Sequence, residues 1–251
     1  MRVEFEMDRT TLLGKDESWK VGNLGVMQLA HDYPLDLLAE IKRKAHILKE
    51  EQSANMHLNL RFIRDAQKYI PEIGELVHWP GRIEQLSELA GEPLEPYPFS
   101  VINTAVTFMG PDDGTVDWHG DGPPITELVA LETEDVEGGR LELFQGDYEA
   151  TIAAVNAGEE LPEDRMVHIE HKVGSCVFGQ LMSVPHRTEP MTNGSRTTLT
   201  MNLRSQRRPF IDNNPMYYLA ADNPDFAWVE EYIDDVRNRQ LPTYLEYRAA
   251  K

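Results

Sequence analysis

The sequence predicts a single α+β domain, because its pattern changes twice along 251 residues. Residues 1–95 have the apolar periodicity of a mostly helical layer. Residues 96–206 contain closely spaced β-branched and aromatic segments, and residues 207–251 return to helix and loop. No flexible linker or low-complexity tract separates these parts. We therefore expect one domain in which a β core carries a helical N-terminal layer and a C-terminal segment that covers its mouth.

The helical predictions depend on apolar side chains that recur every three or four positions. Pro34 marks a helix start, and the apolar residues between positions 35 and 48 form one stripe opposite Lys and Glu side chains. Two further helices are expected at residues 61–69 and 81–90, and a short helical insertion is expected within residues 147–160.

The strand predictions depend on β-branched and aromatic segments that glycine-containing turns separate. The turns are expected at residues 138–139, 174 and 193–194. The expected strands span residues 98–109, 125–132, 140–144, 167–173, 175–182 and 196–204.

The charge balance limits the classes of partner. The chain has 24 Lys and Arg against 43 Asp and Glu, a net charge of −19, which repels nucleic-acid phosphates and anionic lipids. We therefore expect no nucleic-acid or membrane partner, and no apolar run approaches the roughly 20 residues that cross a bilayer. The single cysteine cannot form an internal disulfide, and the first residues lack a signal peptide's apolar stretch. A cytoplasmic location is expected.

A candidate metal site begins in the segment VDWHGDG, residues 116–122. Side chains alternate between the faces of an extended strand, so His119 and Asp121 point the same way and can bind one ion. Asp117 shares that face and is a rival carboxylate, but its polar surroundings predict an exposed loop residue. Taken alone, an H-x-D pair is also compatible with a surface turn.

The third ligand is expected to be His186, at the end of a strand and before a turn. Two imidazoles and one carboxylate on one face of an octahedron leave three positions for a co-substrate and O2, which suits ferrous iron. A catalytic zinc ion uses the same residue types and is the alternative. His168 and His171 have a helical metal spacing but lie in a strand-like pattern, so both are expected to be surface or core residues.

A conspicuous arginine, Arg196, follows His186 by ten residues, beyond a turn. A hairpin of this length can place its guanidinium beside the metal, where it can hold a carboxylate in a two-pronged contact. Thr198 lies on the same face and can donate its hydroxyl to that carboxylate. This is the geometry that holds the distal carboxylate of 2-oxoglutarate while the keto acid end chelates iron. A zinc site leaves the arginine unexplained.

The H-x-D motif is followed about 65 residues later by a histidine, His186, and ten residues after that by an arginine, Arg196. This combined pattern resembles the iron(II)/2-oxoglutarate-dependent oxygenase superfamily. The EGGRLELF hairpin also resembles that family's sheet turn, and the resemblance covers roughly residues 95–206. It implies a double-stranded β-helix (jelly-roll) core, with Fe(II), 2-oxoglutarate and O2 as cofactor and co-substrates. It also implies oxidative decarboxylation of 2-oxoglutarate to succinate and CO2, coupled to hydroxylation of an unactivated C–H bond.

Within this superfamily the chain looks most similar to stand-alone enzymes that act on free amino acids, among them lysine hydroxylases and related halogenases. In those enzymes an arginine from the N-terminal helical region holds the substrate carboxylate. The resemblance makes Arg61 our candidate for this role, with Arg64 as its rival. The halogenases replace the metal-binding carboxylate with glycine, whereas Asp121 is intact here after Gly120. We therefore predict hydroxylation of a small molecule, preferably a free amino acid such as lysine or another cationic one.

Further polar residues are candidates for the substrate side. Thr200 and Asn202 continue the face of Arg196 at period two, and Asn103 and Thr107 are expected to line the opposite wall. An inward polar group must be hydrogen-bonded, so these residues contact a ligand or only their neighbours. Three other functions stay open: a desaturase or cyclase of a small natural product, a protein side-chain hydroxylase, and a non-catalytic jelly-roll binding protein.

Overall fold

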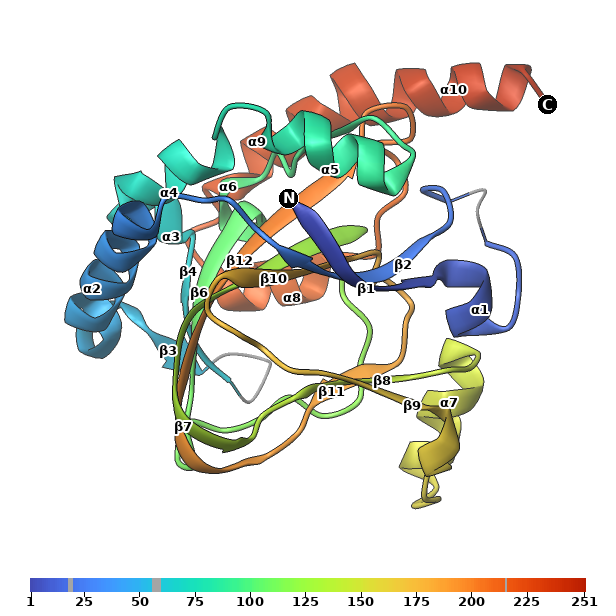
Figure 1. Cartoon of the computed structure of the whole chain (residues 1–251). Helices are drawn as coiled ribbons and strands as arrows, with labels where there is room; N and C mark the ends of the chain where they lie inside the picture. The colour runs from blue at the N-terminus through green and yellow to red at the C-terminus, as the bar shows by residue number, and fades with distance from the viewer. Residues whose placement is uncertain (18–19, 56–59, 215) are drawn as a thin grey trace.

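The computed structural model describes residues 1–17, 20–55, 60–214 and 216–251, which form two facing antiparallel sheets with helices outside them (Figure 1). The larger sheet has the order β1 (Arg2–Asp8), β2 (Leu24–Ala30), β10 (Ser175–Gly179), β7 (Ile125–Gly138), β12 (Met191–Ser205), β6 (Thr104–Met109), β4 (Arg61–Arg64) and β3 (Ala54–Asn55), with β5 (Leu94–Pro96) on β12. The smaller sheet has the order β11 (His186–Thr188), β8 (Leu141–Phe144) and β9 (Met166–Ile169). The predicted α+β chain with a jelly-roll core is confirmed.

The pairing of β7 with β12 organises the larger sheet, since these are its two longest strands and they pair along most of their length. Alternation along β12 directs Arg196, Thr198 and Thr200 into the space between the sheets. The intervening Leu199 and Met201 point to the opposite face, where they join the main apolar core.

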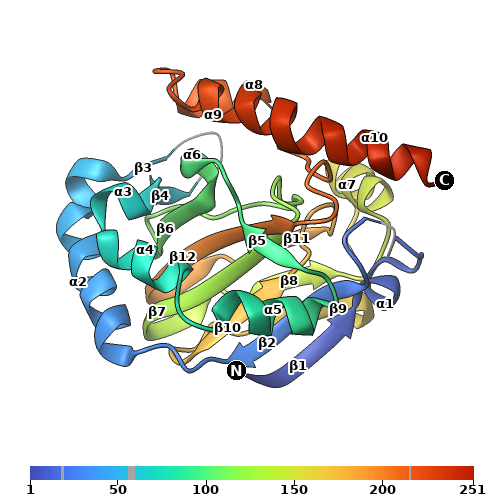
Figure 2. The ribbon, with the colours of Figure 1, turned by 90° about the horizontal axis from the view of Figure 1, so that it is seen from above.

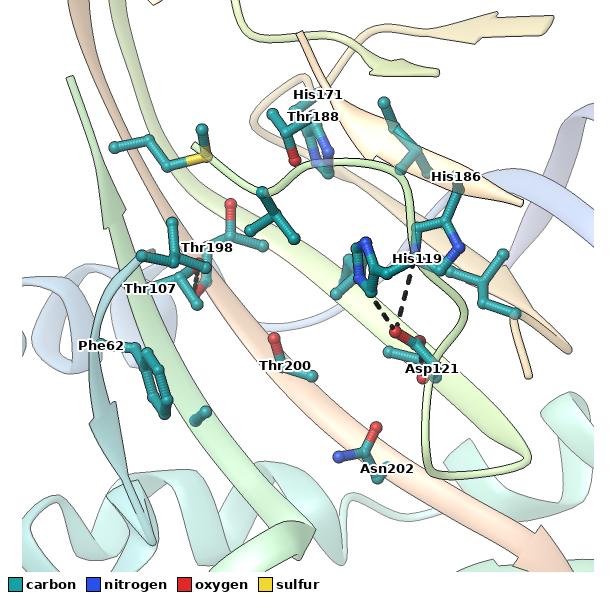
Figure 3. Close-up of a pocket in the computed structure, with 18 of the residues that line it drawn as sticks. Phe62, Thr107, His119, Asp121, His171, His186, Thr188, Thr198, Thr200 and Asn202 are labelled. Carbon is teal, nitrogen blue, oxygen red and sulfur yellow. Dashed lines mark hydrogen bonds and ion pairs between the residues drawn. The ribbon is translucent and has the colours of Figure 1, made fainter. Parts of the chain in front are cut away.

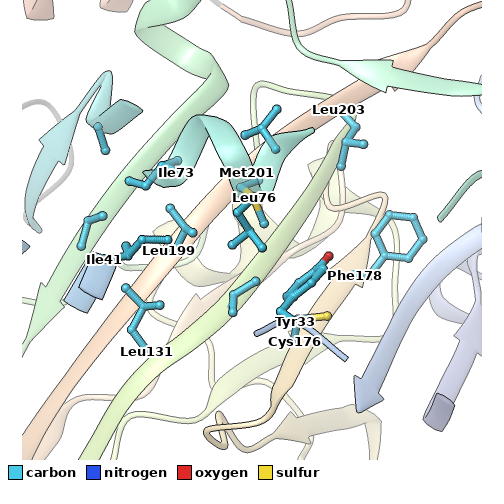
Figure 4. Packing of buried hydrophobic residues seen from close by; sticks show 14 of the residues in the cluster. Tyr33, Ile41, Ile73, Leu76, Leu131, Cys176, Phe178, Leu199, Met201 and Leu203 are labelled. Atoms are coloured by element: carbon cyan, nitrogen blue, oxygen red, sulfur yellow. The ribbon is translucent and has the colours of Figure 1, made fainter. Parts of the chain in front are cut away.

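Helices cover the outer face of the larger sheet (Figures 1 and 2). They are α2 (Leu35–Gln52), α3 (Ala66–Tyr69), α4 (Pro71–Val77) and α5 (Arg82–Ala90). Their apolar faces pack against the outward side chains of the strands in the core that Figure 4 shows, for example Ile41 and Leu76 with Leu199 and Met201. Burying one such side chain contributes about 1.5–3 kcal/mol, so the helical layer fixes which face of the sheet is turned inward.

A second apolar cluster fills part of the space between the two sheets. It joins Leu143 and Val167 of the smaller sheet to Val26 and Val177 of the larger one. Leu181 belongs to this cluster and also lines a cavity at its edge. The cluster therefore closes one part of the jelly roll and leaves the rest hollow.

The N-terminal region differs from the predicted helical layer. Strands β1 and β2 begin the larger sheet, preceding and following the short α1 (Arg9–Leu13). The predicted helix over residues 61–69 is wrong in its first half, because β4 pairs with β6 and only α3 is helical. The predicted strand over residues 98–109 starts instead with α6 (Ser100–Asn103). In each case sheet pairing or local hydrogen bonding determined the secondary structure, which the periodicity of the sequence alone did not predict.

Several later predictions are confirmed. The insertion after β8 forms α7 (Tyr148–Asn156), which Asp147 caps by accepting a hydrogen bond from the backbone N–H of Ala150. It is followed by a short 3-10 helix (Glu163–Arg165) before β9. Strands β7 and β12 extend well beyond the predicted 125–132 and 196–204, because they pair with each other from Met191 opposite Gly138 to Leu203 opposite Ile125. The turn predicted at residues 193–194 is therefore wrong, since these residues lie inside β12.

The C-terminal segment forms α8 (Met216–Asp222), α9 (Trp228–Asp235), a π-helical turn (Val236–Gln240) and α10 (Leu241–Ala249) along one side of the molecule (Figure 2). Arg204 of β12 anchors it through two hydrogen bonds of 2.7 Å to Asp235. Trp228 is buried against the same region. Among the described residues no helix is both long and apolar enough to cross a membrane.

A buried ion pair fastens the helical layer to the sheet. Arg82 of α5 donates to Glu127 of β7 at 2.9 Å through Nε and at 2.5 Å through Nη2. The hydroxyl of Tyr33 donates to the same carboxylate at 2.6 Å. Both charged side chains are almost fully excluded from solvent, so removal of one leaves the other without its counter-charge.

We predict that Arg82→Ala lowers the free energy of unfolding by about 3–5 kcal/mol, because Glu127 is left as an uncompensated buried charge. Urea denaturation followed by circular dichroism measures the change. Arg43→Ala is the matched control, because Arg43 pairs with Glu40 on an exposed helix face; its midpoint should equal that of the wild type. Equal midpoints for all three proteins would contradict the prediction.

Candidate metal centre

Backbone hydrogen bonds bring the candidate ligands together from two distant segments. The N–H of His119 donates to the carbonyl of His186 and the N–H of His186 to the carbonyl of His119, each at 2.9 Å. The N–H of Asp121 donates to the carbonyl of Leu181 at 3.2 Å. His186 begins β11, so the H-x-D segment lies beside the edge of the smaller sheet.

The three side chains converge on one point (Figure 3). The Oδ1 atom of Asp121 lies 3.4 Å from Nε2 of His186 and 3.8 Å from Nε2 of His119. One ligand atom from each residue lies within 4.8 Å of the other two. Adjacent ligands about 2.1 Å from a shared ion stand roughly 3 Å apart, so a small contraction of this group would hold a metal.

Neighbouring hydrogen bonds fix the ligand atoms in the required orientation. Nδ1 of His119 donates to the carbonyl of Asp117 at 2.8 Å, and Nδ1 of His186 donates to the carbonyl of Val184 at 2.9 Å. With the proton on Nδ1, the Nε2 lone pair of each neutral ring is available to a metal. Thr126 donates its hydroxyl to Oδ2 of Asp121 at 2.8 Å, which leaves Oδ1 toward the histidines.

The charges of the group also suit a cation. Burial opposes ionisation of Asp121, but the neighbouring histidines and Thr126 lower its pKa to about 2. Burial and the proximity of His186 lower the pKa of His119 to about 4. At neutral pH the site therefore offers one carboxylate and at least one neutral imidazole, and the residues present fit a divalent metal ion.

An inner cavity of about 210 Å³ extends from the metal group between the sheets. Its walls are mainly apolar and include Met109, Val116, Leu128 and Leu181. Arg196 also lines it, and so do Thr198 and Thr200 of the same strand. A small polar ligand can therefore reach both the metal group and the guanidinium while little water surrounds it.

The buried arginines of the chain differ in one respect. Four of the described arginines have an exposed fraction of 5% or less: Arg9, Arg82, Arg196 and Arg204. Three of these have a carboxylate partner at 2.5–2.9 Å, in the pairs Arg9–Glu17, Arg82–Glu127 and Arg204–Asp235. Arg196 has no such partner among the described residues, and burial lowers its pKa to about 10.

Other polar atoms along β12 also lack partners. The guanidinium donates to the carbonyl of Gly139 and approaches the sulfur of Met109, but its Nε atom is buried without an acceptor in the described part of the chain. The hydroxyl of Thr198 and Oδ1 of Asn202 are likewise buried and unpaired there. Buried polar groups are nearly always hydrogen-bonded, so the unpaired donors of Arg196 and Thr198 give their part of the wall the character of a binding site for an anion.

An outer cavity of about 440 Å³ meets the metal group from the other side. His119, Asp121 and Asn202 line both cavities. The outer cavity is also lined by Arg64 and by Asp222 of α8, whose side chains form an ion pair at 2.5 Å. The C-terminal segment thus contributes part of its wall.

The predicted substrate residues occupy different places. Arg61 points to the face of β4 that is turned away from both cavities, where it donates to Ser53 at 2.7 Å and pairs with Glu50 at 3.0 Å. Its rival Arg64 points to the outer cavity, three positions further along the strand. Asn103 ends α6 and is not among the residues that line either cavity. Thr107 lines the inner cavity but donates to the carbonyl of Thr198 at 3.3 Å.

Thr126 and His171 line the inner cavity but were not predicted as site residues. Thr126 belongs to β7, and period two from the neighbouring Leu128 would have identified it. His171 lines the inner cavity beside Arg196. Strand β9 ends at Ile169, so the alternation that suggested a surface or core position does not extend to His171. Asp117, the rival carboxylate, is not part of the converging group.

Comparisons with known proteins give structural matches alone. No family model matches the sequence, and no curated protein does. The α-ketoglutarate-dependent carbocyclase SnoK from nogalamycin biosynthesis is similar with a TM-score of 0.55 and 16% identity, over 73% of this chain and 80% of SnoK. A Pseudomonas putida prolyl-4-hydroxylase is similar with a TM-score of 0.51 and 16% identity, over 72% and 93%. HygX from Streptomyces hygroscopicus, solved with nickel and 2-oxoglutarate, has a TM-score of 0.55 and 13% identity, over 72% and 83%.

The chain has the fold of these oxygenases. The likeness spans nearly three quarters of the chain. At identities of 13–16% it establishes the architecture, and the chemistry depends on the residues themselves.

We predict that Thr126→Val weakens metal binding by about 10–100-fold, because the hydroxyl that orients Asp121 is lost while the ligands remain. Titration of the metal-free protein with Fe(II) under anaerobic conditions gives the affinity. Thr200→Val is the control, because Thr200 lines the same cavity without a described bond to a ligand residue. Unchanged affinity in Thr126→Val would show that Asp121 is oriented without this hydrogen bond.

Proposed function

We propose that this protein is a non-haem Fe(II)/2-oxoglutarate-dependent dioxygenase whose iron ligands are His119, Asp121 and His186. The observation that carries the proposal is Arg196, a buried guanidinium without a carboxylate partner among the described residues, which lines the same cavity as the metal group. A dicarboxylate that reaches from the metal to Arg196 supplies the missing counter-charge. The same observation favours iron over zinc, because a zinc-bound water needs no such anion site.

Each residue has a defined task in this proposal. Arg196 and Thr198 hold the distal carboxylate of 2-oxoglutarate, and the three ligands leave positions for its keto acid end and for O2. When bound, iron would supply the site of O2 activation, with O2 as the oxidant for C–H hydroxylation and 2-oxoglutarate as the two-electron reductant that leaves as succinate and CO2. The apolar walls exclude water from the reacting centre, and Thr126 keeps Asp121 turned toward the metal.

The direct test is formation of succinate from 2-oxoglutarate by the purified protein with Fe(II), ascorbate and O2. Asp121→Ala should retain the fold and lose succinate formation, because a ligand is removed. A wild-type protein that binds neither Fe(II) nor 2-oxoglutarate would refute the proposed function.

We predict that Arg196→Ala weakens 2-oxoglutarate binding by at least about tenfold, since two charge-assisted hydrogen bonds are lost. Iron affinity should stay within about twofold, because the arginine is not a ligand. Calorimetric titrations of metal and of 2-oxoglutarate separate the two effects. Equal losses in both titrations would indicate that Arg196 supports the fold rather than the co-substrate.

The substrate proposed is a small molecule, preferably a free amino acid, in the outer cavity. The ion pair of Arg64 and Asp222 there supplies a cation and an anion, which match the carboxylate and ammonium groups of an amino acid. HygX has been solved with hygromycin B bound, which supports a small-molecule substrate for a chain of this fold. Arg64 replaces Arg61 as the candidate carboxylate-binding residue because Arg61 points to the opposite face of β4.

A second candidate reaction is cyclisation or another oxidative rearrangement of a small natural product. SnoK is described as a carbocyclase and SnoN as an epimerase of nogalamycin biosynthesis, and both are similar in structure to this chain. A screen of amino acids and small natural products for stimulated succinate release, followed by product mass, separates the reactions. A gain of one oxygen supports hydroxylation, and a loss of two hydrogens supports cyclisation or desaturation.

We predict that Arg64→Gln raises the KM of an amino-acid substrate by at least about tenfold, because a charge-assisted contact is lost. Succinate formation without substrate should be unchanged, since Arg64 does not line the inner cavity. Arg61→Gln is the matched control, three residues away on the other face of β4, and should leave KM unchanged. The reverse pattern would restore Arg61 as the substrate-binding residue.

A further inference from the structure

His171 is a second polar residue in the part of the inner cavity that contains Arg196. It lies in the loop between β9 and β10, where no regular strand pairing constrains it. Its ring lies apart from His119, Asp121 and His186, as Figure 3 shows, so it is not part of the metal group. Among the described residues no hydrogen bond or ion pair engages its side chain.

His171 and Arg196 together separate the inner cavity from a hollow on the outside of the sheets. These two residues line both spaces, and no other residue in the described part of the chain does so. This outer hollow, which is distinct from the outer cavity beside the metal group, is also lined by Gly139, Arg140 and Glu170. The imidazole can therefore face a ligand on its inner side and exchange protons with solvent on its outer side.

The charges around His171 keep it neutral when no anion is bound. Burial and then the charge of Arg196 lower the pKa of His171 well below 6.5. The other charged groups that face it from the outer hollow are compensated elsewhere: Arg140 pairs with Glu189 at 2.8 Å, and Glu170 pairs with Lys172 at 3.4 Å. A carboxylate placed between Arg196 and His171 would offset the repulsion and favour the protonated ring.

We propose that His171, in its protonated form, binds the distal carboxylate of 2-oxoglutarate together with Arg196 and Thr198. The inference rests on the proposed function and adds a residue to its co-substrate site. Binding of the dianion takes up as much as one proton from solvent, through the outer hollow, and no bond other than this N–H is formed. His171 thereby selects keto acids that have a second carboxylate and couples co-substrate binding to pH.

The test compares 2-oxoglutarate with 2-oxobutanoate, which has the keto acid end but no distal carboxylate. Calorimetric titrations use the protein loaded with Ni(II), which binds without turnover. We expect His171→Ala to weaken 2-oxoglutarate binding about tenfold and to leave 2-oxobutanoate binding unchanged. His171→Gln retains a neutral donor and should recover part of the loss.

Proton uptake is measured by repeating the 2-oxoglutarate titration near neutral pH in two buffers with different ionisation enthalpies. The wild type should take up a proton with 2-oxoglutarate and none with 2-oxobutanoate, and both His171 variants should lose this uptake. His168→Gln is the matched control from the same segment, because His168 pairs with Glu142 and Glu163 away from the cavity.

The outcomes separate the two proposals. A wild type that binds no 2-oxoglutarate refutes the proposed function and this inference with it. A wild type that binds it, with either unchanged discrimination in His171→Ala or no proton uptake, overturns the role of His171 alone. Equal loss of both keto acids in His171→Ala would also overturn it, because that result indicates a structural role.

Discussion

The candidate site depends on the two reciprocal backbone hydrogen bonds between His119 and His186. These residues are far apart in sequence, and their side chains converge because their main chains exchange both N–H and carbonyl groups. A further bond, from the N–H of Asp121 to the carbonyl of Leu181, holds the carboxylate ligand against the segment that precedes His186. Backbone pairing places the ligands regardless of side-chain rotamers, and the Nδ1 and Thr126 contacts then set those rotamers.

The two sides of the larger sheet differ in whether their buried charged side chains have a counter-charge. On the helix-facing side, Arg82 and Glu127 neutralise each other, and Tyr33 satisfies a further acceptor site. On the cavity side, Arg196 has no carboxylate partner among the described residues, and the hydroxyl of Thr198 on the same face of β12 is also unpaired there. Burial of a charge without a partner is costly. A ligand that supplies the missing counter-charge therefore best explains why the guanidinium of Arg196 is buried in this wall.

The position of the C-terminal segment explains how the outer cavity is bounded. Arg204 on β12 holds α9 through Asp235, and Asp222 on α8 meets Arg64 on β4. The same strands that carry the inner cavity's polar face therefore anchor the segment that lines the outer one.

The sequence alone predicted the candidate metal ligands, the arginine ten residues after His186 and the β core, because the alternation of side chains along a strand is a local property. The hairpin expected between His186 and Arg196 does not form, since β11 pairs with β8 whereas β12 pairs with β6 and β7. The sequence also placed Thr198, Thr200 and Asn202 on one face. Tertiary structure decided that Arg64 rather than Arg61 meets a cavity, since only the pairing of β4 with β6 shows which face of that strand is inward. It alone brought His171 to Arg196, because loop residues have no periodicity from which a direction can be inferred.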